Sequence, residues 1–431
     1  MNVGIIGGGY AGMAAATILA AHNIPVTVFE SARQLGGRAR GVPHNGLQLD
    51  NGQHLLLGCY HHTLNLIGQV GGNIAQDFLR LPLQLTLHHR FELKAPRLPA
   101  PLHLLAGLLG ARGLSFAERM QAARFMLAVR RVNFTLPQDR TVLELLREYG
   151  QSAELVRLLW EPLCIAALNT PADQASAQVL LHVLRDSLHG PRANSDLMLP
   201  RLDFSSLFPQ RAARYVEQHG GKVLTSCGAE AIVLRDNEVE VVTAQGIQRF
   251  THVICAASPA NAARLFRTVP QLVSIAAQIE AIPYQPIYTV YLQYPARVQL
   301  PQAMIGLDRC FAQWLFDKGR IAGQHGLIAA VISAEGLHQN LERDALAQHV
   351  AQELQEQLGI TDMPLWHQVI AEKRATFSCL VGLDRPSQAT PLPNVFLAGD
   401  YTAGDYPATL EGAVMSGVRC AEQIGNLPHE N

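Results

Sequence analysis

The chain has 431 residues, of which 48% are hydrophobic and 16% charged, and its formal net charge is −1. This length allows two domains with large cores, and 34 basic against 35 acidic residues exclude a global field that recruits nucleic acid. The charged fraction lies below the roughly 25% of typical soluble proteins. We therefore expect extensive buried surface, an apolar cavity or contact with a membrane surface.

The chain opens with a predicted strand, a glycine-rich loop and a helix. An apolar run at 3–6 precedes the loop, and an alanine-rich run at 13–21 follows it. Glycines at the spacing G-x-G-x-x-G permit a tight turn and close approach of a pyrophosphate, while the helix N-terminus offers N–H groups to it. The spacing alone is a weak signal, but the order of elements supports a dinucleotide site. Its predicted cofactor contacts are Gly7, Gly9, Ala11 and Gly12.

A second predicted strand, 25–29, ends at Glu30, which follows Gly12 by 18 residues. A carboxylate about 20 residues after the last glycine is expected to bind a ribose hydroxyl. Because that carboxylate repels a 2′-phosphate, the pattern argues against NADP.

Near the other end of the chain, a predicted strand at 395–397 leads to Gly399 and Asp400 and then to a helix from Pro407 onward. If both ends of the chain carry features that bind one nucleotide cofactor, the fold must bring the two ends to the same site. We therefore expect an elongated cofactor that runs along the fold, which indicates FAD rather than NAD.

The middle of the chain is predicted to hold a helical block that runs to about residue 190, after a strand at 83–87. Ser115 with Glu118, and Thr141 with Glu144, have the spacing of capping boxes, and Pro171 stands where a proline often opens a helix. Further on, Pro209 opens another predicted helix. The later predicted strands are 222–225, 231–235, 239–243, 252–256, 284–294, 313–316, 327–333 and 366–377, with a helix at 344–358.

These elements predict an α/β fold in which two domains alternate along the chain. A discontinuous, Rossmann-like FAD-binding domain is expected at 1–80, 205–265 and 390–431, and an α+β substrate-binding domain at 81–204 and 266–389.

Several other classes of site are disfavoured. The seven cysteines are scattered without a C-x-x-C pair, and the doublets His61-His62 and His88-His89 cannot place both rings on one face, so no metal site is expected. No apolar run reaches 18 residues and no targeting segment is recognised, so we expect a cytoplasmic protein. The Pro-bounded apolar segment 96–109 is either a helix packed in the substrate domain or a peripheral contact with the membrane interface.

Three further stretches carry a family resemblance. They are Gly36-Gly37-Arg38, Asp50-Asn51-Gly52-Gln53-His54 and the end from Gly399 to Gly412. With the glycine loop, they make essentially the whole chain resemble the FAD-dependent amine oxidase and phytoene desaturase superfamily. Within it, the stretches 50–59, 160–170, 372–377 and 397–402 are most similar to the squalene-associated desaturase-like flavoproteins, the bacterial hydroxysqualene dehydroxylases of hopanoid synthesis.

The resemblance implies roles for individual residues toward FAD. Glu30 would bind the adenosine ribose, and Ala229, where the family usually carries valine, would pair with adenine through its backbone. Leu410 would direct its N–H toward the flavin pyrimidine ring, where a helix N-terminus stabilises the negative charge of the reduced flavin. The other implied contacts, at the pyrophosphate, ribitol and flavin, are Gly37, Arg38, Gln53 and Asp400.

The resemblance also implies a reaction, the reduction of hydroxysqualene to squalene. A general acid would protonate the allylic hydroxyl, water would leave, and hydride from the reduced flavin would reach the cation in a dry, apolar tunnel that suits a long isoprenoid. The candidate acids are His54 and Asp405, with Tyr406 as a donor or an aromatic ring facing the cation. Alternatively, His54 contributes only its backbone and Asp405 only caps the last helix. The sequence does not indicate what reduces the flavin.

Two other readings stay open. The first is an amine oxidase or a carotenoid-type desaturase on the same fold, although lysine is scarce and only Lys373 lies where an amine oxidase would need one. The second is a prenyl-lipid carrier similar to the GDP-dissociation inhibitors, which share the fold without using flavin. The intact flavin-binding stretches around Arg38 and Asp400 argue against the carrier.

Overall fold

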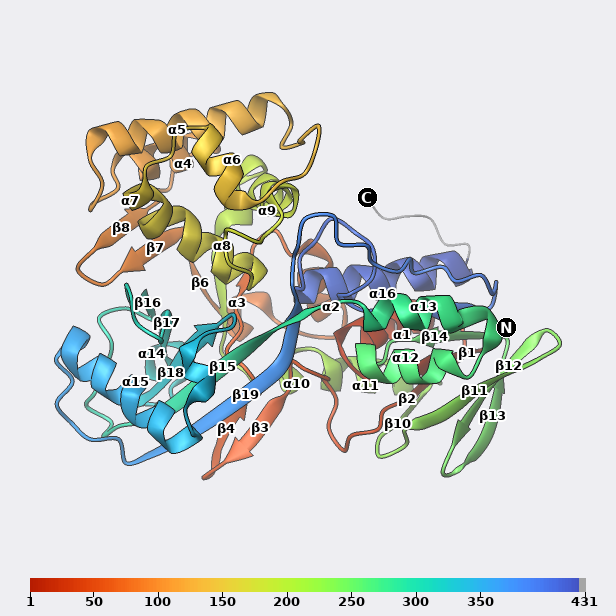
Figure 1. Cartoon of the computed structure of the whole chain (residues 1–431). Coiled ribbons are helices and arrows are strands. Elements are labelled where there is room, and N and C mark those ends of the chain that lie inside the picture. Colours follow the sequence, from red (N-terminus) through yellow and green to blue (C-terminus); the bar gives the residue numbers. More distant parts are fainter. Residues whose placement is uncertain (426–431) are drawn as a thin grey trace.

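The nucleotide-binding part of the molecule is a five-stranded parallel sheet (Figure 1). The computed structural model describes residues 1–425; residues 426–431, the end of the predicted FAD-binding domain, lie outside the described residues. The strand order is β10 (Lys222–Leu224), β2 (Val26–Phe29), β1 (Val3–Ile6), β14 (His252–Cys255) and β20 (Val395–Leu397). These strands are short and mostly apolar, as expected of a parallel sheet that is covered on both faces.

Helices cover both faces of this sheet. Val3 and Ile5 of β1 share a core with α1 (Tyr10–Ala21), α11 (Pro209–Gln218) and α16 (Leu410–Gly425). Ile6 belongs instead to the core that contains α12 (Pro259–Arg267) and α13 (Val273–Glu280). Successive residues of a strand point to opposite faces, so the alternation within β1 assigns the two helix layers. A three-stranded antiparallel sheet lies beside them, formed by β11 (Ala229–Arg235), β12 (Glu238–Thr243) and β13 (Gly246–Phe250).

A second, seven-stranded sheet forms the other half of the molecule. Its order is β19 (Trp366–Phe377), β15 (Tyr284–Gln293), β18 (Leu327–Ser333), β17 (Trp314–Asp317), β16 (Met304–Gly306), β7 (Gln84–Leu87) and β8 (Phe91–Lys94). The helix α15 (Arg343–Leu358) packs against β15 and β19. These two long antiparallel strands run from the second sheet toward the nucleotide-binding part (Figure 1), so they connect the two halves.

A helical lobe stands above the second sheet in the view of Figure 1. The predicted capping boxes at Ser115 and Thr141 are confirmed, since each side chain accepts the N–H of the glutamate three residues later. The elements of the lobe are α4 (Leu102–Leu109), α5 (Phe116–Arg131), α6 (Val142–Glu148), α7 (Ala153–Leu155), the π-helix η1 (Val156–Trp160), α8 (Glu161–Leu168), α9 (Ala177–Leu184) and the π-helix η2 (Arg185–His189).

The prediction that a helix begins at Pro171 is wrong. The chain turns there, and α9 begins six residues later, at Ala177, with Ser176 Oγ accepting the Val179 N–H at 3.1 Å. Thr170 does not cap a helix, because its hydroxyl donates to the Leu168 carbonyl at 3.0 Å and accepts the Cys379 N–H.

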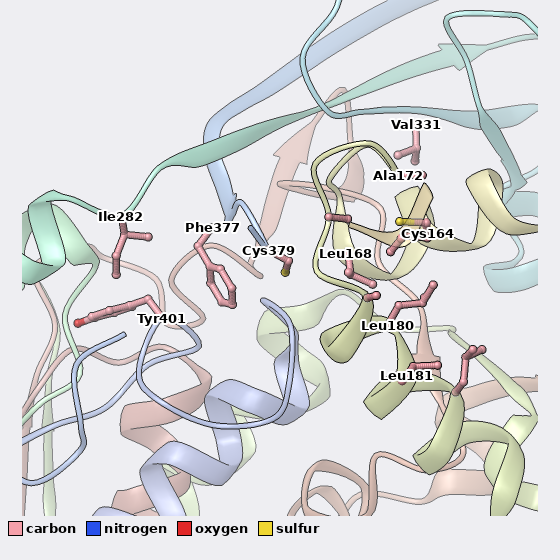
Figure 2. Packing of buried hydrophobic residues seen from close by; sticks show 14 of the residues in the cluster. Cys164, Leu168, Ala172, Leu180, Leu181, Ile282, Val331, Phe377, Cys379 and Tyr401 are labelled. Atoms are coloured by element: carbon pink, nitrogen blue, oxygen red, sulfur yellow. The ribbon is translucent and has the colours of Figure 1, made fainter. Parts of the chain in front are cut away.

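The lobe shares a core with the ends of the long strands and the carboxy-terminal segment. Figure 2 shows Leu168, Leu180 and Leu181 of the lobe on one side of this core, and Phe377 and Tyr401 on the other. The lobe is therefore joined to the nucleotide-binding part by buried apolar contacts.

The remaining elements are the strands of two small sheets and several short helices. They are β3 (Gly41–His44), β4 (Leu47–Asp50), β5 (Leu56–Leu57), α2 (His61–Gln69), α3 (Ile74–Asp77), β6 (Phe78–Leu81), η3 (Arg192–Ser195), β9 (Leu197–Pro200), α10 (Phe204–Leu207), η4 (Pro270–Leu272), α14 (Lys318–Ala322) and η5 (Leu337–Asn340). The strands form a two-stranded sheet, β3-β4, and a three-stranded sheet of order β5-β9-β6. Within residues 1–425, no helix has both the length and the apolar character needed to cross a membrane. The predicted α/β class is confirmed, whereas the domain boundaries remain predictions.

Candidate cofactor and active site

The glycine loop has the conformation that a phosphate site needs. Gly7 has a φ of +113°, and Gly9 precedes α1 with no side chain capping the helix N-terminus. A Cβ added to Gly12 would lie 2.0 Å from the Gly7 carbonyl oxygen, so only glycine lets the helix start so close to β1. The first N–H groups of α1 are therefore directed out of the loop, where they can bind an anion.

A second glycine pair lies against the first. Gly36 donates its N–H to the Gly8 carbonyl at 2.9 Å and forms a β-bridge with Gly9. A Cβ added to Gly37, whose φ is +61°, would lie 3.4 Å from the Gly9 Cα, so two stretches of bare backbone face each other. This arrangement fits a pyrophosphate, which needs close backbone approach.

Glu30 is positioned at the end of β2 beside the same loop. Its carboxylate accepts the Gly8 N–H at 2.7 Å and the Ala32 N–H at 2.8 Å. Its own carbonyl accepts the Cys227 N–H at 2.8 Å, which brings the segment leading to Ala229 next to it. Glu30 and the segment before β11 thus lie together beyond the carboxyl end of β2, while their contacts with adenosine remain a prediction.

The carboxy-terminal part of the site meets the amino-terminal part through Arg38 and Asp400. Their side chains form an ion pair, and Arg38 also donates to the Ala375 carbonyl of β19 at 2.8 Å. Burial lowers the pKa of Arg38, but the adjacent Asp400 carboxylate opposes this shift, and the pKa of Arg38 is raised above its ordinary value. Gly399, next to Asp400, donates to Ser416 Oγ of α16 at 2.8 Å. Residues from both ends of the chain are therefore fixed at one place.

The sequence did not indicate Arg385, which organises the loop after Asp400. Its guanidinium donates to the carbonyl oxygens of Asp400 at 3.3 Å and Tyr406 at 3.2 Å, and also to Gly404. The same group lies 4.6 Å from the centre of the Phe377 ring. One cation therefore holds the loop from residue 400 to 406 against the end of β19. In the sequence, nothing marks Arg385 except that it is a charged residue in the segment before the buried strand β20.

His54 is held as a neutral imidazole. Its Nδ1 lies 2.6 Å from the Gly52 carbonyl, and because a carbonyl only accepts, Nδ1 carries the hydrogen and Nε2 is an acceptor. The pKa of His54 is lowered to about 4, chiefly by burial and also by the nearby Arg38 charge, while the hydrogen bond to Gly52 opposes this shift. In this state His54 accepts a hydrogen bond at neutral pH, whereas an acid role requires it to gain a proton.

A buried lysine supports the loop that carries His54. Lys318 Nζ donates to Gln53 Oε1 at 3.2 Å and lies 4.0 Å from Asp50 Oδ2, and the Lys318 and Asp50 side chains are only 5% and 3% exposed. Burial raises the pKa of Asp50 to about 6 and lowers that of Lys318. Lys373, which the sequence singled out, is instead exposed on β19. No local pattern distinguishes Lys318, because its burial depends on the packing of α14 beneath residues 50–54.

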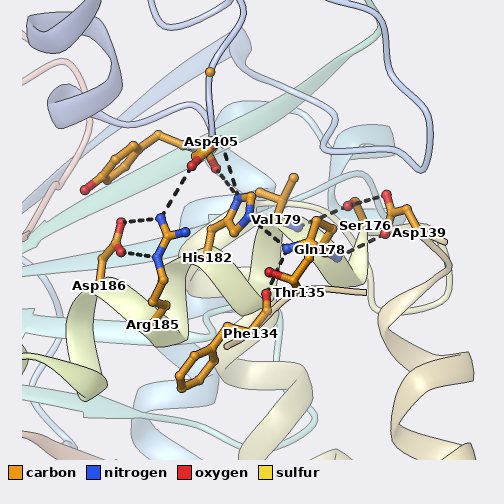
Figure 3. Close-up of polar contacts among 12 residues, drawn as sticks. Phe134, Thr135, Asp139, Ser176, Gln178, Val179, His182, Arg185, Asp186 and Asp405 are labelled. Carbon is orange, nitrogen blue, oxygen red and sulfur yellow. Dashed lines mark hydrogen bonds and ion pairs between the residues drawn. The ribbon is translucent and has the colours of Figure 1, made fainter. Parts of the chain in front are cut away.

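Asp405 lies where the loop after Asp400 meets the helical lobe (Figure 3), and Tyr406 follows it in the chain. Asp405 Oδ2 is 3.4 Å from an Arg185 nitrogen, the Asp405 carbonyl is 3.3 Å from His182 Nδ1, and the Asp405 side chain is 58% exposed. Burial raises the pKa of Tyr406, and the nearby Asp186 carboxylate raises it further. Tyr406 therefore stays protonated and can donate a hydrogen bond, while Asp405 links the loop after Asp400 to the helical lobe.

Leu410 is the first residue of α16. The preceding Thr409 caps this helix, since its Oγ1 accepts the Gly412 N–H at 3.1 Å. A Cβ on Gly417 would lie 2.0 Å from the Ala11 carbonyl oxygen, so α16 packs directly against α1. The predicted flavin-side helix and the predicted pyrophosphate helix are thus neighbours.

Comparison with known proteins agrees with this geometry. The sequence pattern of the flavin-containing amine oxidoreductases matches residues 10–425. The chain is 28% identical to the hydroxysqualene dehydroxylase of Rhodopseudomonas palustris over 98% of both chains, and 26% identical to the zeta-carotene desaturase of Synechocystis over 98% of this chain and 97% of that one. The solved structure of cyclohexylamine oxidase from Brevibacterium oxydans superposes with a TM-score of 0.71 at 19% identity, covering 99% and 98% of the two chains.

Proposed function

The chain belongs to the flavin-containing amine oxidoreductase family, and from that premise we propose that it reduces hydroxysqualene to squalene. It is an FAD-dependent oxidoreductase, and the bare glycine backbones, Glu30 and the uncapped start of α1 fit that cofactor. The observation that carries the substrate is the likeness to a named hydroxysqualene dehydroxylase along nearly the entire length of both chains.

The proposed reaction exchanges a hydroxyl for a hydrogen on one carbon of the substrate. The C–O bond breaks, the hydroxyl takes a proton and leaves as water, and a hydride forms the new C–H bond. Bound FAD in its reduced form supplies that hydride, with both electrons. An external reductant must then return two electrons to the protein for the next turnover.

The chain's own residues would supply the proton and the surroundings. Tyr406 is a protonated phenol, half-buried beside Asp186 of the helical lobe, so it can donate a hydrogen bond to a leaving hydroxyl. Neutral His54 offers Nε2 as an acceptor, which can orient that hydroxyl. Asp405, paired with Arg185, remains the candidate that can relay a proton from solvent, because its side chain is the most exposed of the three.

The test is anaerobic mixing of the reduced protein with hydroxysqualene. We expect the flavin spectrum to return to the oxidised form as squalene appears, in equal amounts. If the reduced flavin persists while the substrate is unchanged, the proposed reaction is incorrect.

A carotenoid-type desaturation is the second candidate, because a zeta-carotene desaturase matches nearly as much of the chain. A desaturase removes electrons from its substrate, so the two activities run in opposite directions. Mixing the oxidised protein with zeta-carotene therefore separates them: bleaching of the oxidised flavin would favour the desaturase.

A further inference from the structure

Exposed apolar side chains are concentrated on one part of the helical lobe. Fifteen large hydrophobic side chains are exposed among the described residues, and seven of them lie between residues 98 and 132, so their distribution is not a random scatter. Leu102, Leu105 and Leu109 follow one another at helical spacing and share one face of α4. Phe116, at the start of α5, is 72% exposed. Figure 1 shows α5 along the outer edge of the molecule, and α4 packs beside it.

The opposite side of α4 is firmly anchored, so the exposed leucines do not reflect a loosely placed helix. His103 and Leu108 are buried, and His103 Nε2 lies 3.3 Å from Ser195 Oγ. Arg119 of α5 donates to the carbonyl oxygens of Leu109 at 3.0 Å and Leu114 at 3.0 and 3.1 Å, which joins the end of α4 to the start of α5. The two helices thus present one fixed surface.

This surface is also strongly basic. Residues 90–131 contain eight basic and two acidic residues, a net charge of +6, whereas the whole chain has a net charge of −1. Both acidic residues already have partners: Glu92 pairs with Lys94 and Arg112, and Glu118 accepts from Ser115. Arg97, Arg124 and Arg131 are exposed on the same segment. Residues 90–131, which include α4 and α5, therefore combine an apolar helix face with a net positive charge.

We propose that this surface, the α4–α5 face, docks onto an anionic lipid bilayer. It consists of Leu98, Leu102, Leu105, Leu109, Phe116 and Leu127 with Arg97, Arg124 and Arg131. Exposed leucines and phenylalanine enter the boundary of the acyl chains, while arginines bind lipid phosphates. A second copy of this chain is disfavoured as the partner, because a symmetric contact would bring two positively charged faces together.

The test is co-sedimentation of the full-length protein with vesicles, without any substrate, so its outcome is independent of the proposed reaction. One set contains phosphatidylglycerol and phosphatidylcholine in equal parts, and the other contains phosphatidylcholine alone. We expect binding to the anionic vesicles, weakened by high salt because salt screens the arginines, and much weaker binding to phosphatidylcholine.

Two variants divide the surface into its apolar and charged parts. Leu102→Gln/Leu105→Gln/Leu109→Gln is expected to lower the partition constant at least tenfold, and Arg124→Ala/Arg131→Ala roughly 25-fold, about fivefold for each arginine. The matched controls are Leu337→Gln/Met363→Gln, which alters exposed apolar side chains outside the lobe, and Arg214→Ala/Arg343→Ala; both should bind as the wild type does. Circular dichroism and the thermal midpoint report whether each variant folds.

Three results would overturn the proposal. The first is a wild-type protein that does not sediment with anionic vesicles, or that sediments equally with both kinds. The second is a folded triple-leucine variant that binds as tightly as the wild type. The third is a wild-type dimer that the leucine variant converts to a monomer, which would assign the face to a second copy of the chain.

Discussion

Arg38 and Asp400 form an ion pair although 362 residues separate them in the chain. Arg38 follows the glycine pair that lies against the first nucleotide loop, and Asp400 follows the last strand of the parallel sheet. The sequence around Arg38 does not reveal that Asp400 is its partner, and the sequence around Asp400 does not reveal Arg38; only the fold brings them together. Their contact shows that the two ends of the chain build a single site, which is the arrangement that an elongated dinucleotide requires.

We expect Asp400→Ala to weaken FAD binding and to lower stability by about 1.5–3 kcal/mol, because it leaves a largely enclosed guanidinium without its carboxylate. The free energy of unfolding from urea titration, and FAD retention read from the flavin absorbance after gel filtration, measure the two effects. Arg297→Ala, which removes a more exposed ion pair with Asp362, is the control and should change stability by less than about 1 kcal/mol. Equal effects of the two variants would contradict a special role for Asp400.

Gly12→Ala should destabilise the protein and impair FAD binding, because the new Cβ would lie 2.0 Å from the Gly7 carbonyl oxygen. Relief of that clash must shift α1 or the loop, at a cost of roughly 1–3 kcal/mol. Gly68→Ala, within α2, is a matched control: a Cβ there has nothing within 4 Å, so the same change should be neutral or slightly stabilising. Thermal midpoints of both apoproteins, followed by FAD titration, test the contrast.

Lys318→Met should be more destabilising at pH 8 than at pH 5. Burial raises the pKa of Asp50 to about 6 and Lys318 opposes that rise, so removing the lysine raises this pKa further. A carboxyl whose folded pKa is raised stabilises the fold when protonated, and this stabilisation is lost as the pH increases through that pKa. The expected loss is about 3 kcal/mol at pH 8 and smaller at pH 5.

Urea titrations of the Lys318→Met and wild-type proteins at both pH values measure this difference. Lys222→Met, at an exposed lysine, is the control and should show no such pH dependence. The same loss at pH 5 and pH 8 would mean that Asp50 and Lys318 do not interact in the folded protein.

Tyr406→Phe and Asp405→Asn should each lower turnover of hydroxysqualene by about 10²-fold or more while FAD remains bound, which is typical of the loss of a proton donor. His54→Ala is expected to raise KM more than it lowers kcat, because a neutral imidazole that only accepts a hydrogen bond orients the substrate. Steady-state kinetics with a chemical reductant distinguishes these effects. Turnover at the wild-type rate in any variant removes the role assigned to that residue.

Local sequence was enough for many of the elements. The strands at 327–333 and 366–377 were predicted to the residue, since long β-rich runs bounded by turns define their own ends. The capping boxes at Ser115 and Thr141 were equally reliable, because a cap is made by residues three positions apart. Pro171 misled the prediction because Thr170 bonds to the distant Cys379 instead of capping a helix.

By itself, the sequence determined the class of the fold, the glycine loop and the family, because these depend on neighbouring residues and on fixed spacings. Only the tertiary structure identified the roles of Arg385 and Lys318, and only it showed that the apolar segment at 96–109, which the sequence left open, exposes its leucines beside α5. The physical reason is that burial and charge pairing are properties of distant segments in contact. The sequence alone does not show whether a lysine is exposed to water or buried beneath a cofactor-binding loop.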